Sequence, residues 1–139
     1  MKQLIDHVQF EQIENGFIDA MYFADGADAD FRDDEGFYLD GLFDKELDLS
    51  EQSIQIIKDL IKSILKRIPE NDLLELTNSL SLDRIGNCIY YDVQGHGVGF
   101  SEENISQDLI DLLESITYGY TLELFDDNQV HLSYWTRRH

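Results

Sequence analysis

The chain has 139 residues, of which 29 are acidic and 10 are basic, so its formal net charge is −19. This charge excludes a nucleic-acid-binding surface and attraction to anionic lipid, because phosphates are met by a basic face that the sequence does not provide. Since 42% of the residues are hydrophobic, there is enough apolar material for a core, which excludes a disordered acidic tail and predicts a single domain over residues 1–139.

The sequence offers few means of metal binding, disulfide formation or membrane insertion. Its single cysteine, Cys88, cannot form an intramolecular disulfide, and one cysteine with four scattered histidines does not make a four-ligand zinc site. No stretch approaches the roughly 18 apolar residues that span a bilayer, and the N-terminal residues lack the basic and apolar regions of a signal peptide. We therefore expect a cytoplasmic protein without metal, cofactor or membrane contact.

Three helices are predicted in the first part of the chain. Apolar residues at spacings of three and four predict a helix over residues 7–24. Ser50 is the expected N-cap of a second helix over 50–68, whose basic last turns complement the helix dipole. That helix ends at Pro69, and a run of leucines predicts a short helix over 70–80.

The residues between the first two helices, 25–48, form an acidic stretch that is predicted to be irregular. Six acids and one arginine lie in residues 25–35 alone. A calcium loop is disfavoured here, because Arg32 falls on a ligand position and Asp33 falls where the loop requires glycine. A solvated loop, a weak site for a hard cation and a surface for a basic partner remain as alternatives. For the partner surface, the predicted contact residues are Asp25, Asp28, Asp30, Phe31, Asp33, Asp34, Glu35, Phe37, Tyr38 and Asp40.

A β-hairpin is predicted next. Residues Cys88–Val93 are rich in β-branched and aromatic side chains, and Gln94–Gly97 turn the chain into a second short strand at Val98–Phe100. The glycines of this turn do not predict a phosphate-binding loop, because they lead into a strand and no lysine follows. The residues assigned to the structural turn are Gly95, His96, Gly97 and Gly99.

The last part of the chain predicts a helix followed by a second hairpin. Ser101 or Asn104 is the expected N-cap of a helix over 105–117, whose outer positions are acidic. Residues 120–125 and 129–135 then flank a turn of two aspartates and an asparagine. The predicted fold is α+β, with helices at the N-terminal side packed on a small antiparallel sheet of two β-hairpins separated by a helix.

One pair of side chains could form a small catalytic centre. If the first hairpin forms, Asp92 can reach His96 across it, and such a pair could transfer a proton. No nucleophile, metal site or second carboxylate accompanies the pair in a recognisable arrangement. His96 between glycines is therefore interpreted as a turn residue, with catalysis as the minor alternative.

A resemblance adds to this interpretation. The stretch Ile85–Phe100, in which an apolar run leads into Gly-His-Gly-Val-Gly-Phe, resembles a group of small tailed-phage and prophage proteins with a strand followed by a Gly-His-Gly-x-Gly-Phe turn. The likeness continues in the aromatic and small-residue segment Phe17–Tyr22 and in the helix that ends in a glycine before the final hairpin. The chain departs from the group at residues 101–103, where Ser-Glu-Glu replaces Trp and Asp-Arg. The resemblance implies a phage or prophage origin and an α+β fold, without a mechanism.

Charge and resemblance together predict a non-enzymatic phage protein that binds and inhibits a host nucleic-acid-binding protein, such as a restriction or CRISPR nuclease. Residues 25–35 carry a net charge of −5 over about 36 Å when extended, which is about half the linear charge density of a single DNA strand. Partial DNA mimicry through residues 25–48 follows. The alternatives are an accessory or assembly protein of the phage particle and, less favoured, a small enzyme at Asp92 and His96. A homodimer through Tyr134 and Trp135 is also left open.

Overall fold

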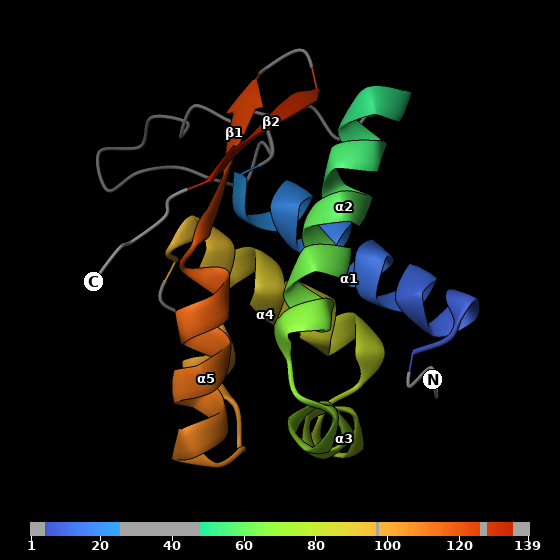
Figure 1. The fold of residues 1–139 in the computed structure, drawn as a ribbon. Helices are drawn as coiled ribbons and strands as arrows, with labels where there is room; N and C mark the ends of the chain where they lie inside the picture. Colours follow the sequence, from blue (N-terminus) through green and yellow to red (C-terminus); the bar gives the residue numbers. More distant parts are fainter. Residues whose placement is uncertain (1–4, 26–47, 97, 126–127, 135–139) are drawn as a thin grey trace.

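The computed structural model describes residues 5–25, 48–96, 98–125 and 128–134 (Figure 1). Within these ranges the helices are α1 (His7–Asp25), α2 (Glu51–Arg67), α3 (Glu70–Ser79), α4 (Leu82–Gln94) and α5 (Gln107–Thr117), and a 3-10 turn, η1, covers Phe100–Glu102. Strands β1 (Tyr120–Phe125) and β2 (Gln129–Tyr134) form an antiparallel hairpin. Figure 1 shows α4 in the middle of the helices, with the hairpin at one end of the molecule and α3 at the opposite end.

The three helices predicted before residue 82 are confirmed. Ser50 caps α2 as expected, because its side-chain oxygen accepts a hydrogen bond from the N–H of Ser53 at 3.1 Å. Helix α2 ends at Arg67, its C-cap Ile68 is the residue before Pro69, and two basic side chains occupy its last turn. The faces of α1 and α2 that carry the predicted apolar period are buried, with Ile13, Phe17, Ala20, Met21, Ile57, Leu60, Ile61 and Ile64 in the core.

The crossing of α1 and α4 is the largest helix contact of the fold, and it depends on two glycines. A Cβ atom on Gly16 would overlap the carbonyl oxygen of Asp83, and a Cβ atom on Gly86 would overlap the carbonyl oxygen of Ile13. The two helix backbones are therefore in direct contact at this point. Beside them, Asn87 of α4 donates a side-chain hydrogen bond to the carbonyl oxygen of Gly16 at 2.6 Å.

The first predicted hairpin is wrong, since residues 82–94 form helix α4 where a strand over Cys88–Val93 was expected. Gly95, with a φ of 72°, ends the helix in the left-handed conformation that glycine adopts easily. The physical reason is packing: the buried residues recur at spacings of three and four and so line the face that meets α1 and α5. These buried residues are Ile85, Gly86, Cys88, Ile89, Tyr90, Asp92 and Val93.

The last helix and hairpin largely follow the prediction. Ser106 caps α5, accepting a hydrogen bond from the N–H of Leu109 at 3.3 Å, so the helix begins later than a cap at Ser101 or Asn104 implies. The hairpin pairs its strands in register from Tyr120 opposite Tyr134 to Phe125 opposite Gln129. An α+β fold is confirmed, and the described sheet has two strands in place of the expected four.

Side chains of two helices bind the outer edges of this hairpin. The amide of Gln94 on α4 bonds both backbone groups of Leu122: it accepts from the N–H at 2.9 Å and donates to the carbonyl oxygen at 3.0 Å. On the other strand, the hydroxyl of Ser53 on α2 accepts from the N–H of Val130 at 3.0 Å. The hairpin is thus fixed between α4 and α2 by hydrogen bonds that a neighbouring strand would otherwise make.

Candidate functional site

The predicted partner surface is described only at its ends. Asp25, the last residue of α1, is described, and Asp48 precedes α2 with its side chain exposed. The other predicted contact residues, together with the loop considered for calcium, lie outside the described residues: Asp28, Asp30, Phe31, Asp33, Asp34, Glu35, Phe37, Tyr38 and Asp40. The described residues that flank the acidic segment 26–47 are 22–25 and 48–53. We call these two flanking stretches the first and the second stem.

At the first stem, the Asp25 carboxylate is bound by two side chains from the end of α4 and the turn after it. Its Oδ2 atom accepts a hydrogen bond from the hydroxyl of Tyr90 and lies 3.1 Å from Nε2 of His96. A carboxylate at the C-terminus of a helix is disfavoured by the helix dipole, so these partners offset an unfavourable position. Burial, followed by the bond to Asp25, raises the pKa of Tyr90 above its ordinary value, so the phenol keeps its proton and acts as donor.

The expected pair of Asp92 and His96 is not formed, because the hairpin that would bring the two together is a helix. His96 bonds Asp25, whereas Asp92 is only 3% exposed and its Oδ2 atom accepts from the N–H of Phe100 at 3.4 Å. Burial raises the pKa of Asp92 to about 6, the bond from Phe100 opposes this shift, and the charge of Glu114 adds to it. A side chain on Gly99 would overlap the Asp92 carboxylate, so glycine lets the loop close over it.

A hollow of about 360 Å³ lies beside His96. Its one described cation, Arg84, is bound by both carboxylate oxygens of Glu103, with Nε to Oε1 at 2.5 Å and Nη2 to Oε2 at 3.2 Å. This two-point pairing holds the guanidinium in one orientation and neutralises its charge locally. The hollow is lined by Phe23, Ala24, Arg84, Tyr91, His96 and Val98.

At the second stem, three polar side chains form a network between α2 and β2. The hydroxyl of Ser50 donates to Oε1 of Gln129 at 2.9 Å, and the hydroxyl of Ser53 lies 3.3 Å from the same oxygen. The preceding residue, Asn128 in the hairpin turn, is fully buried with a φ of 62°, and its Nδ2 atom lies 3.4 Å from the hydroxyl of Tyr22 on α1. Two adjacent residues, Asn128 in the turn and Gln129 at the start of β2, therefore contact the two stems. Sequence patterns gave no signal for either contact.

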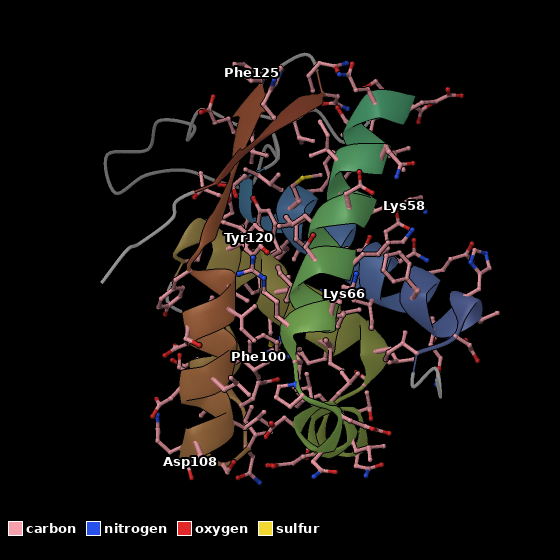
Figure 2. The ribbon with its side chains drawn as sticks, in the orientation of Figure 1. Lys58, Lys66, Phe100, Asp108, Tyr120 and Phe125 are labelled. Atoms are coloured by element: carbon pink, nitrogen blue, oxygen red, sulfur yellow. The ribbon has the colours of Figure 1, made fainter. Side chains whose placement is uncertain are left out.

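The basic side chains of the described ranges are largely engaged within the fold. Lys58 forms an ion pair with the buried Glu14 at 2.8 Å, and Arg84 forms the pair with Glu103. Lys62 lies 5.7 Å from the ring centre of Phe10, and the guanidinium of Arg67 lies 5.4 Å from that of Tyr120, both within range of cation–π attraction. Figure 2 shows Lys58 and Lys66 on α2, far from Asp108 at the start of α5.

Cys88 is fully buried on α4, and burial, with a further contribution from Glu103, raises the pKa of its thiol to about 12. We expect the folded protein at pH 8 to react with a disulfide reagent at least about 100-fold more slowly than a free thiol, because both access and thiolate are lacking. The measurement is the rate at which the reagent's coloured thiolate is released, followed by absorbance with and without denaturing urea. Rapid labelling of the folded protein would show that the α4 face opens readily.

Neither a metal centre nor a membrane span is found in the described parts of the chain. They contain no group of three or more His, Cys, Asp and Glu side chains placed to hold an ion. None of their helices combines the length and the apolar character needed to cross a bilayer. No protein-family model matches this chain, and no curated protein or solved structure matches it either.

Proposed function

We propose that this chain is a non-enzymatic acidic protein of phage or prophage origin that binds the basic, nucleic-acid-binding surface of a host protein and inhibits it. The observation that carries the proposal is the engagement of most of the cations in the described part of the chain. Lys58 and Arg84 are paired with carboxylates, and Lys62 and Arg67 lie over aromatic rings. These four side chains are therefore occupied within the fold and do not shield further exposed acids, and the acidic excess that gives the net charge of −19 is available to a basic partner.

The charge is concentrated enough to imitate a few phosphates. Residues 25–35 carry six acids and one arginine, and the bonding of Asp25 to Tyr90 and His96 leaves five acids for a partner. Exposed acids on other elements, such as Asp108 and Asp111 on α5, extend the negative field. Such a field steers a basic surface toward the protein, and aromatic residues within the segment, such as Phe31 and Tyr38, supply apolar contact area.

The test is capture of host proteins at low salt by two variants with equal net charge. One variant replaces the segment acids by amides: Asp28→Asn, Asp30→Asn, Asp33→Asn, Asp34→Asn and Glu35→Gln. The matched control replaces five exposed acids elsewhere: Glu11→Gln, Asp59→Asn, Glu75→Gln, Asp111→Asn and Glu123→Gln. Because each variant loses five negative charges, a difference between them reports the location of the charge and not its total.

We expect the segment variant to lose the captured protein and the control to retain it. The captured protein should also dissociate as salt rises, with affinity falling at least about tenfold between 50 and 200 mM, because exposed charge pairs are screened. The captured protein should be a nucleic-acid-binding protein whose DNA or RNA competes with this chain. Equal recovery by both variants, or binding that is independent of salt, would contradict the proposal.

A further inference from the structure

The hollow beside His96 is walled by large apolar side chains that stay exposed in the folded chain. Phe23 is 66% exposed and Val98 is 46% exposed, whereas most large apolar side chains of the described residues are buried. Phe23 lies near the end of α1 and Val98 in the loop after α4, so the fold brings the two walls together from distant parts of the sequence. Exposed apolar surface gathered in a hollow is typical of a binding site.

The other walls of the hollow are held in place by ion pairs. The Nε2 atom of His96 lies 3.1 Å from Oδ2 of Asp25, and the imidazole ring stands at 87° to the ring of Tyr91, with 6.0 Å between the ring centres. Arg84 is held at two points by Glu103. These walls are therefore oriented before a ligand arrives, which lowers the entropy that binding costs.

The pairing of Arg84 favours an aromatic ligand over an anionic one. Glu103 occupies one edge of the guanidinium, at Nε and Nη2, and its own charge would repel a carboxylate or a phosphate. The two faces of the planar group take no part in this pairing, and the Arg84 side chain is 41% exposed. Aromatic rings stack favourably on such a face, and the rings of Tyr91 and His96 supply further aromatic contacts. The hollow therefore suits a flat, uncharged ring.

The charges around the hollow indicate what should carry this ring. Asp19 lies one turn before Phe23 on α1, and Glu102 is the neighbour of Glu103 in η1. Both acids are exposed, and neither forms an ion pair with another residue in the part of the chain that the structure describes. A ring that is flanked by cations would gain from these charges, whereas a neutral aromatic compound would not.

We infer that the hollow binds an aromatic side chain that a basic partner protein carries next to arginine or lysine. The ring stacks on the face of Arg84 and contacts Phe23 and Val98, while Asp19 and Glu102 attract the flanking cations. This inference rests on the proposed function, because it takes the partner to be basic. It adds an apolar anchor, which supplies the specificity that attraction between net charges lacks.

The test compares two peptides with blocked ends and equal charge, Arg-Trp-Arg and Arg-Ala-Arg. Binding to the full chain is followed at low salt through the shifts of backbone amide signals in nuclear magnetic resonance spectra. We expect the tryptophan peptide to bind at least about fivefold more tightly, with its largest shifts at Ala24, Tyr91 and Val98. The alanine peptide measures the attraction that charge alone provides.

Two pairs of alanine variants locate the site. Phe23→Ala and Val98→Ala each remove one wall of the hollow, and both positions are exposed, so the core is left intact. Phe125→Ala and Val8→Ala remove the same side chains from exposed positions outside the hollow. We expect each variant of the first pair to weaken binding of the tryptophan peptide at least about threefold and to leave binding of the alanine peptide unchanged. The second pair should change neither affinity.

The outcomes separate this inference from the proposed function. Equal affinity for the two peptides would overturn the inference, as would an equal loss of affinity in Phe23→Ala and Phe125→Ala. In either case the proposed function stands if the alanine peptide binds and is released as salt rises. Binding of the tryptophan peptide that is independent of salt would contradict the proposed function, while the variants still decide whether its ring occupies the hollow. If neither peptide binds, both proposals fail.

Discussion

Replacing Gly86 by alanine is expected to lower the free energy of unfolding by about 3 kcal/mol or more. The added Cβ would overlap the carbonyl oxygen of Ile13 and lie 2.6 Å from the backbone nitrogen of Phe17. Both atoms belong to the backbone of α1, which cannot move aside as a flexible side chain can. The two helices would have to separate, and the buried side chains between them would lose contacts. Urea unfolding followed by circular dichroism measures the change.

Gly95→Ala is the matched control for this substitution. Gly95 follows α4 directly as its C-cap, whereas Gly86 lies within the helix. Nothing lies within 4 Å of a Cβ atom placed on Gly95, and its only constraint is a φ of 72°. We expect a cost of about 1 kcal/mol from the left-handed backbone alone. If Gly86→Ala is no more destabilising than Gly95→Ala, the backbones of α1 and α4 are not in direct contact at Gly86.

Asp92→Asn is expected to stabilise the protein at pH 7 by on the order of 2 kcal/mol. The pKa of Asp92 is raised from 3.8 to about 6 in the folded state, chiefly by burial. The folded state therefore binds the proton more tightly than the unfolded state, and the contribution of Asp92 to stability falls as the pH rises from about 4 to about 6. An asparagine keeps an oxygen that can accept from Phe100 and carries no charge to bury.

The measurement is the difference in unfolding free energy between variant and unmodified protein at several pH values, which cancels the titration of the other carboxylates. This difference should be small near pH 4, grow through pH 5 and 6, and level off near pH 7. Asp59→Asn, at an exposed position on α2, is the matched carboxylate-to-amide control. A difference for Asp92→Asn that does not vary with pH would mean that this carboxylate is hydrated in the folded protein.

The sequence predicted the elements whose local signals agree with their packing. Helix α2 has an apolar period, a serine cap and a proline stop, and all three lie where they were expected. Helix α4 was missed because Ile89, Tyr90 and Val93 favour strands by local propensity, while their burial together with Ile85 and Cys88 is decided by contacts with other helices. A stop signal was present in Gly95, but it was interpreted as part of a hairpin turn.

The acidic residues of the candidate site could be predicted from the sequence, but the contacts that its flanking residues make could not. An acidic stretch beginning at Asp25 is visible in the sequence, but the bond from Tyr90 depends on how α1 crosses α4. The trace of that crossing in the sequence is the pair Gly16 and Gly86, which acquires meaning only when both segments are known to be helices. The Gln129 contact likewise requires the hairpin to be placed against α2.

The binding of the hairpin edges by helices has a consequence for how copies of this protein can associate. A two-stranded hairpin exposes outward N–H and C=O groups to which a strand of another molecule can add, and this is a common route to aggregation. Here both outward groups of Leu122 are taken by Gln94, and the outward N–H of Val130 is taken by Ser53. A second chain would have to displace these side chains before it could extend the sheet at those positions. Strand-to-strand association between copies of the chain is therefore opposed at Leu122 and at Val130.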